Sequence, residues 1–554
     1  MTRKEKILNY SSWFIFFTTT IYTLLIGQLY YLTTKGPDYS FYRPYFEYFF
    51  GNISSTGVEQ GLLYYFINAT IISIDSENLI PVLWDQYFSN SIQWGNFFFY
   101  LIGIYGIYTF LKQKNTEKRN IFIILSLINL FPPAVEMRLL FKPEILVFSC
   151  LIWIIVFFDK YLETESLLYL LSSIPPLALV LTTKANLAIM IILFLLSFYL
   201  KKIYEINVVN FYKGLIILTM FFLVTSFENY QANELLIYEH QSPEEFTNSA
   251  ELDFLYNINL ETLKNDPFRQ SQKDSYLGVM ILDTFDDYFG NFWNDDSSPL
   301  YLNRSVFFNV KETAYLGIVF TFIFYAYLLS NIFKNKNYRY LYTMPFFGIF
   351  FQMILSQFIQ YDPTTGDVAK TYYYAFFLVI TFALLLSELA KQNIKVFLVI
   401  SLIFSISIVH VYGFPKNSSD GQNDFINMNN EISSLCFLGG MLLPNVDSDC
   451  EEKSYVVCDY AFNIKETVII SNSKYLYKEN LPASEVYFNK NNKKTIVTSF
   501  DDCISNVNRG NKVIQKYDID KIPIINLLNL FLFLFSIIFY RFKNESRPKS
   551  SYIY

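Results

Sequence analysis

The sequence predicts an all-α polytopic membrane protein of about twelve transmembrane helices, with a small extracytoplasmic α+β domain near the C-terminus. Of the 554 residues, 53% are hydrophobic and only 17% are charged, whereas a soluble globular protein carries about 25% charged residues. Apolar stretches of membrane-spanning length recur along most of the chain. An alternating count of the spans puts the short basic connections between them on one side, as expected for a protein inserted with a fixed orientation.

The apolar stretches define the predicted spans, because crossing the hydrocarbon core takes about 20 mostly apolar residues. These spans fall near 10–32, 94–111, 120–135, 144–158, 166–182, 186–200, 211–227, 313–333, 340–359, 371–390, 395–412 and 522–540. The paired prolines Pro132–Pro133 and Pro175–Pro176 are expected to break or kink the two helices that contain them. The first stretch is too long for a cleavable signal and has no small-residue cleavage site, so we expect it to remain as a helix.

The distribution of Lys and Arg predicts that both termini are cytoplasmic. With that orientation every short basic connection falls on the same side: 3–6, 112–119, 160, 201–202, 334–339, 391–395 and 541–549. The opposite side then receives the long polar segments. The bacterial inner membrane is the preferred location for such a chain.

Three regions follow from this topology. Residues 1–412 form the transmembrane domain, with long external loops at 33–93 and 228–312. Residues 413–520 form the extracytoplasmic domain, and residues 521–554 supply the last transmembrane helix and a basic cytoplasmic tail. Within the first loop, the semi-apolar stretches 61–74 and 79–88 suit helices that lie along the membrane surface.

Cysteine usage agrees with an external position for residues 413–520. Four of the five cysteines fall there: Cys436, Cys450, Cys458 and Cys503. Because disulfides persist in oxidising compartments, this set predicts one or two bridges. Three pairings remain open, as do four free thiols, while a zinc site is disfavoured because no CxxC pair or nearby histidine is present.

Candidate chemistry rests on carboxylates, because the chain has only two histidines. Asp38 follows the first span directly, among aromatic residues, and Glu47 lies nine positions later. A carboxylate in such a partly desolvated place can act as a general base. An ordinary solvated loop acid is the alternative.

Cations cluster in the external turn that follows the third span. The turn reads EMRLLFKPE and carries Glu136, Arg138, Lys142 and Glu144, and Lys184 lies outside where two later spans meet. Arg and Lys at the membrane edge are suited to hold the phosphate of a lipid. Snorkelling side chains at helix ends are the alternative.

Acidic residues gather in the second long loop, where Asp283, Asp286 and Asp287 precede a predicted span. Oxygen ligands of this kind bind hard cations, so a divalent metal remains open, although the spacing is not that of a calcium-binding loop. The alternative is that the aromatic residues of this loop pack it onto the membrane and that the acids bind no metal. A shorter outer turn brings Asp362, Asp367 and Lys370.

The order of these features resembles the GT-C superfamily of membrane glycosyltransferases, such as protein O-mannosyltransferases and lipid A aminoarabinose transferases. The matching pieces are PDYSFYRPYFE in the first loop, MRLLFKPE after the third span and LTTKAN at the end of the fifth. The likeness covers roughly residues 1–230. The chain departs from the mannosyltransferases in having a single Asp38 in place of an Asp-Glu pair, and it has no WWDYG-like signature.

The resemblance implies transfer of a sugar from a polyprenyl-phosphate donor to a hydroxyl or amine of a lipid, glycan or protein acceptor. Asp38, with Glu47 in reserve, would be the base. Arg138 and Lys142, with Lys184 or Lys370, would bind the donor phosphate. No organic cofactor is implied, and membrane lipids are expected partners.

Other function classes remain open, but nucleic-acid binding is disfavoured by the net charge of −6. An O-antigen-type polysaccharide polymerase or ligase shares the expected topology but relies more on external arginines. A polysaccharide flippase or transporter would place charges within the spans, which are nearly free of them. A non-catalytic scaffold for envelope assembly is a further alternative.

Overall fold

A computed structural model describes most of the helical part of the chain and seven short strands. The described residues are 3–29, 39–51, 53–58, 60–75, 84–139, 141–200, 208–234, 284, 310–335, 338–358, 374–412, 436–438, 441–443, 467–470, 476–479, 485–490, 493–496, 512–516 and 518–545. Within these residues the protein is mostly helical.

Helices lie at or close to each of the predicted spans. In chain order they are α1 (Arg3–Leu29), α3 (Tyr39–Phe49), α4 (Leu62–Asp75), α5 (Trp84–Gln113), α6 (Lys118–Leu130), α7 (Pro132–Leu139), α8 (Glu144–Thr164), α9 (Leu167–Thr183), α10 (Ala185–Leu200), α11 (Val208–Asn233), α16 (Val310–Lys334), α17 (Arg339–Tyr342), α18 (Met344–Phe358), α19 (Ala375–Gln392), α20 (Ile394–Tyr412) and α24 (Ile524–Glu545).

Five helices are long and apolar enough to cross a membrane within the described ranges. They contain the segments Ile92–Gln113, Glu144–Thr164, Val209–Asn233, Ala375–Gln392 and Ile524–Lys543. The segments in α8 and α19 are the most enclosed by protein, whereas the segment in α11 is largely exposed along its length. The apolar residues of α11 therefore face the surroundings of the bundle, as lipid-facing residues do.

The structure corrects several predicted boundaries. The predicted span 120–135 is two helices, because α6 ends at Leu130 and α7 begins at Pro132, where proline fits a first helical turn. The predicted span 340–359 is likewise divided into α17 and α18. By contrast, α9 continues through Pro175–Pro176 without a break. The predicted surface stretch 79–88 is in part the start of α5, whereas the stretch 61–74 forms α4 as a helix.

The strands within 413–520 form three small antiparallel sheets. They pair β1 (Cys436–Leu438) with β2 (Met441–Leu443), β3 (Thr467–Ile470) with β4 (Leu476–Glu479), and β5 (Glu485–Lys490) with both β6 (Lys493–Ile496) and β7 (Lys512–Lys516). The sheet β6-β5-β7 is the only one with three strands among the described residues.

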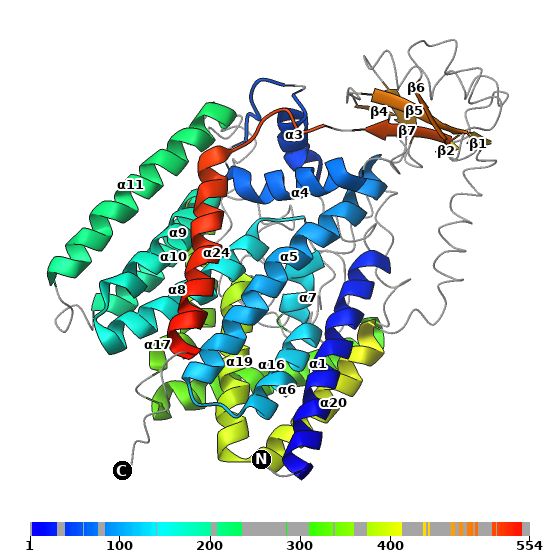
Figure 1. Cartoon of the computed structure of the whole chain (residues 1–554). Coiled ribbons are helices and arrows are strands. Elements are labelled where there is room, and N and C mark those ends of the chain that lie inside the picture. Colours follow the sequence, from blue (N-terminus) through cyan, green and yellow to red (C-terminus); the bar gives the residue numbers. More distant parts are fainter. Residues whose placement is uncertain are drawn as a thin grey trace.

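The bundle has two chemically different ends (Figure 1). The start of α1, the end of α24, and the α5–α6 and α19–α20 turns lie at the lower end in the view, which we call the basic end. Its cations among the described residues include Lys112, Lys114, Lys118, Arg119, Lys160, Lys391, Lys395, Arg541 and Lys543. The opposite end, called the distal end, carries α3 and α4.

A salt bridge ties helices together at the basic end. Lys114, just after α5, lies 2.6 Å from Asp159 of α8, and both side chains are about nine-tenths buried. The Lys114 ammonium also lies 4.5 Å from the centre of the Tyr338 ring. The Tyr340 hydroxyl donates to Asp159 over 3.4 Å, so one ion pair joins α5, α8 and the α17 segment.

At the distal end, Glu228 of α11 satisfies the first turn of α24. Its carboxylate accepts hydrogen bonds from the backbone N–H groups of Ile525 and Asn526 at 2.9 and 2.8 Å, and from the Asn526 amide at 2.7 Å. An anion at a helix N-terminus offsets the helix dipole and satisfies N–H groups that have no intrahelical acceptor. A second bond, from Asn529 to Thr225 over 2.6 Å, continues the α11–α24 contact.

We therefore expect Glu228→Ala to lower the free energy of unfolding by roughly 1–2 kcal/mol, as loss of a helix cap does. Denaturant unfolding of the purified chain in detergent measures the change. Glu163→Ala is the matched control, because Glu163 forms an exposed pair with Lys160, and such pairs contribute less than about 1 kcal/mol. Equal effects of the two substitutions would contradict the capping role.

Candidate functional site

Four charged residues lie on adjoining segments at the distal end, and three of their side chains are buried. Arg138 is at the end of α7, Lys142 follows it, Glu144 begins α8, and Lys184 directly follows α9. Arg138 is 0% exposed, Lys142 2% and Glu144 1%. We call these four residues the charged cluster.

The burial of Arg138, Lys142 and Glu144 argues against the alternative of snorkelling side chains at helix ends. Arg138 lies on a helix rather than in a turn, and the Lys142 side chain is enclosed rather than extended to an interface. Burying a charge is costly unless polar or charged groups compensate it. These residues are therefore held in place by their surroundings rather than exposed at a loop tip.

The surroundings of Arg138 come from three other helices. Its Nε donates to the Thr23 hydroxyl of α1 over 3.1 Å. Its backbone carbonyl accepts from the Asn96 amide of α5 over 2.8 Å, and the Asn96 carbonyl oxygen accepts from the Tyr64 hydroxyl of α4 over 2.7 Å. Tyr64 and Asn96 thereby fix the position of the helix turn that carries Arg138.

An ion pair between Glu144 and Lys184 joins the start of α8 to the end of α9. Lys184 Nζ lies 3.5 Å from Glu144 Oε1, with the lysine side chain 16% exposed. Glu144 Oε2 is buried and accepts no hydrogen bond from the described part of the chain. Glu144 also occupies the first turn of α8, where the helix dipole favours a negative charge.

The first loop packs directly against the charged cluster. Phe46 of α3 stacks on Phe141, which lies between Arg138 and Lys142, with ring centroids 5.4 Å apart. Tyr65 of α4 meets the same Phe141 ring edge-on at 5.6 Å and stacks on Tyr45 at 3.9 Å. Loop one and the basic segment, about a hundred residues apart in sequence, are thus in contact.

The loop also reaches the end of α9, beside Lys184. The Gly61 N–H donates to the Thr183 carbonyl over 2.8 Å. A Cβ on Gly61 would lie only 2.7 Å from the Thr182 carbonyl oxygen, so this close backbone approach requires glycine. The Asn233 amide of α11 donates to the Gln60 carbonyl over 2.9 Å and holds the other side of the loop.

Three predicted external segments therefore meet in one place: loop one, the 138–144 segment and the 183–184 connection. Glu47 lies on α3, in the loop-one layer, and its side chain is partly buried. Asp38, Lys370, Asp283, Asp286 and Asp287 lie outside the described residues, as do Cys450, Cys458 and Cys503. Cys436 begins β1, and Cys150 is a buried free thiol in α8.

Sequence reasoning missed the uncharged polar groups that support the cluster. Tyr100 of α5 donates to Asn129 over 2.7 Å, and the Asn129 amide donates to the hydroxyls of Thr19 and Thr20 of α1. The available signal was asparagine within apolar spans, since amides there hydrogen-bond between helices. Among described residues, no three His, Cys, Asp or Glu side chains gather as metal ligands.

The Glu144–Lys184 pair yields a stability prediction. Glu144→Gln or Lys184→Gln alone leaves a charge near a weakened partner, so each should lower the free energy of unfolding by about 1–3 kcal/mol. The double substitution should cost less than the sum of the two, because neither charge remains. Denaturant unfolding of the four proteins measures the coupling, and additive effects would mean that the pair makes no stabilising contact.

No protein-family model matches the chain, and no curated protein or solved structure shows significant similarity to it.

Proposed function

We propose that this protein is a glycosyltransferase of the bacterial inner membrane that moves a sugar from a polyprenyl-phosphate donor to an extracytoplasmic hydroxyl or amine. The observation that carries the proposal is the charged cluster, with three cations and one acid enclosed at one end of an apolar bundle. The proposal includes about twelve spans, cytoplasmic termini and an extracytoplasmic domain at 413–520, with the basic end facing the cytoplasm.

The chemistry of a polyprenyl-phosphate donor suits such a place. Its tail stays in the lipid, while its phosphate lies at the level of the headgroups, where the ends of the helices also lie. When the bond between the sugar carbon and the phosphate oxygen breaks, negative charge grows on the departing polyprenyl phosphate. Fixed cations stabilise that charge, and an arginine does so with paired, directed donors.

Within the cluster, Arg138 and Lys142 are the proposed phosphate ligands, with Lys184 or Lys370 as a further contact. Glu144 holds Lys184 in position through the 3.5 Å pair. The acceptor hydroxyl or amine attacks the sugar carbon and gives its proton to a carboxylate. Asp38 is the proposed base because of its place in loop one, and Glu47 on α3 is the reserve.

The packing of loop one supports this assignment of roles. Because Phe46 stacks on Phe141, the helix that carries Glu47 lies against the segment that carries Arg138 and Lys142. This contact supports drawing the base and the phosphate site from these two segments. A flippase or polymerase reading has no comparable observation in its favour.

The proposal predicts that Arg138→Gln/Lys142→Gln weakens binding of a polyprenyl monophosphate to the purified full chain by at least about tenfold, since hydrogen bonds to charged groups contribute roughly 1.5–3 kcal/mol each. Titration in nanodiscs with the lipid as probe measures the affinity. Lys391→Gln, at the basic end and paired with Glu388, should leave the affinity unchanged.

Arg138→Lys keeps the charge but not the forked donors, so it should weaken binding less than Arg138→Gln. Gel filtration checks that each variant is folded. The graded series then distinguishes loss of phosphate binding from misfolding. Asp38→Asn should keep lipid binding but lower release of polyprenyl phosphate from polyprenyl-phosphate sugars by about a hundredfold or more. Unchanged binding in the double variant would refute the phosphate site, and unchanged release in Asp38→Asn would refute the base.

A further inference from the structure

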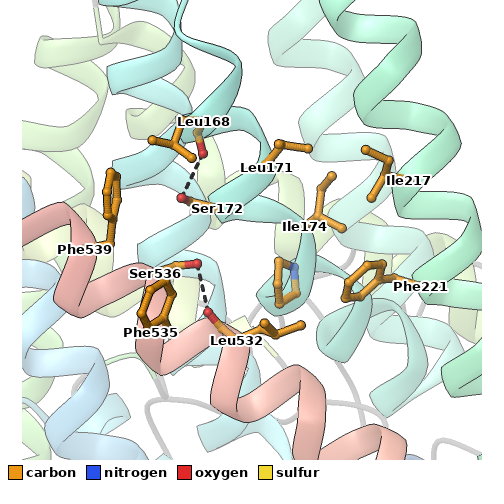
Figure 2. A pocket seen from close by; sticks show the side chains of 11 residues that line it. Leu168, Leu171, Ser172, Ile174, Ile217, Phe221, Leu532, Phe535, Ser536 and Phe539 are labelled. Atoms are coloured by element: carbon orange, nitrogen blue, oxygen red, sulfur yellow. Dashed lines mark hydrogen bonds between the residues drawn. The ribbon is translucent and has the colours of Figure 1, made fainter.

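An apolar groove of about 510 Å³ lies between α9, α11 and α24, and Figure 2 shows the side chains that line it. Leu168, Leu171, Ile174 and Pro175 of α9 form one wall. The other walls come from Ile217 and Phe221 of α11 and from Leu532, Phe535 and Phe539 of α24. Most of these residues belong to the halves of the three helices that lie toward the basic end, and Pro175, Phe221 and Leu532 lie near the middle of their helices.

The hydrogen bonds that the structure describes between α11 and α24 lie in their distal halves, and the groove begins beyond them. There Glu228 and Thr225 of α11 bind Asn526 and Asn529 of α24. Toward the basic end the two helices separate (Figure 1), and α9 lies between them as the floor. On the α11 side, Gly214 allows a close approach to α9, since a Cβ there would lie 2.7 Å from Leu170 Cδ2.

The walls are almost entirely apolar. The only polar side chains lining the groove are Ser172 and Ser536. Their hydroxyls donate to the carbonyls of Leu168 and Leu532, one helical turn earlier, at 2.9 Å each (Figure 2). Ordered water needs two or more polar partners, so hydrocarbon rather than water suits this space.

Two lysines stand at the basic end of the groove. Lys213 precedes Ile217 and Phe221 by one and two helical turns, so the three residues lie along one face of α11. Lys543 follows Phe539 by one turn on α24, and its ammonium lies 4.8 Å from the centre of the Tyr169 ring. Of the described acids nearby, Asp159 and Glu163 are paired with Lys114 and Lys160, and Glu165 lies in the α8–α9 turn. The two lysines therefore outnumber the one further acid at the mouth of the groove.

We propose that this groove binds one acyl chain of an anionic phospholipid, with the phosphate beside Lys213 and Lys543. The dimensions agree with this occupant. From Leu532 to Lys543 the helix rises by about 16 Å, and one leaflet of a bilayer has a hydrocarbon depth of roughly 15 Å. The lipid fills the space beside α11, which is largely exposed, beyond its hydrogen bonds with α24. The proposal is independent of any transferase activity.

Photocrosslinking of the full chain in vesicles tests this site. The probes are a phosphatidylglycerol and a phosphatidylcholine that carry the same diazirine acyl chain, and the readout is the labelled peptides. Phosphatidylglycerol should label the groove segments of α9, α11 and α24 more strongly than phosphatidylcholine. Lys213→Gln/Lys543→Gln should remove most of that preference, because each lysine near an anionic lipid contributes roughly fivefold.

Matched variants separate the groove from the general lipid boundary. Ser536→Phe fills the groove and should reduce its labelling severalfold, whereas Thr219→Phe adds the same bulk on an exposed position of α11 and should not. Lys391→Gln should keep the preference for phosphatidylglycerol. Equal labelling by the two lipids, or labelling unchanged in Ser536→Phe, would overturn the proposal. Displacement of the probe by a polyprenyl monophosphate but not by unlabelled phosphatidylglycerol would also overturn it and assign the groove to an isoprenoid chain.

Discussion

The enclosure of charge at one end of an apolar bundle is the constraint on which the distal half of this protein depends. Arg138, Lys142 and Glu144 are almost completely buried, and a buried charge persists only where surrounding groups compensate it. Thr23 accepts a hydrogen bond from the Arg138 guanidinium, while Asn96, itself bound by Tyr64, holds the Arg138 backbone carbonyl, and the three residues come from different helices. The arrangement of α1, α4, α5 and α7 is therefore linked to one arginine.

Loop one has a structural part in this enclosure as well as a proposed chemical one. Its aromatic residues cover the 138–144 segment, and its backbone reaches the end of α9 through Gly61 and Thr183. The aromatic richness of the chain has a specific use here, since stacked rings exclude water from the neighbouring charges without adding polar groups that need partners. The hydrogen bond between Glu228 and the first turn of α24 lies at the same distal end.

Much of the helical layout follows from the sequence, because apolar length and basic connections are local properties. Five of the predicted spans are helices long and apolar enough to cross a membrane. The helix is divided at Phe131–Pro132, whereas α9 continues through Pro175–Pro176. The sequence could not distinguish the two outcomes, since both sites contain two adjacent prolines. In α9, neighbouring helices enclose the prolines, and tertiary packing outweighs the local tendency to break.

The candidate site was predictable in its charges but not in its burial. Sequence spacing placed Arg138 and Lys142 near the membrane edge. It does not distinguish a solvated side chain from an enclosed one. Burial arises from long-range packing, such as Phe46 on Phe141 and Asn96 on Arg138, which no local pattern records. The assignments of Asp38, Lys370 and Asp283 concern residues outside the described ranges and stay predictions.

The contact between loop one and the charged segment is best measured by a double-mutant cycle on Phe46→Ala and Phe141→Ala, with unfolding free energies determined in detergent. A stacked pair whose ring centroids are 5.4 Å apart should show a coupling of about 0.5–1.5 kcal/mol. Strictly additive effects would contradict the account, because loop one would then not lie against Arg138 and Lys142.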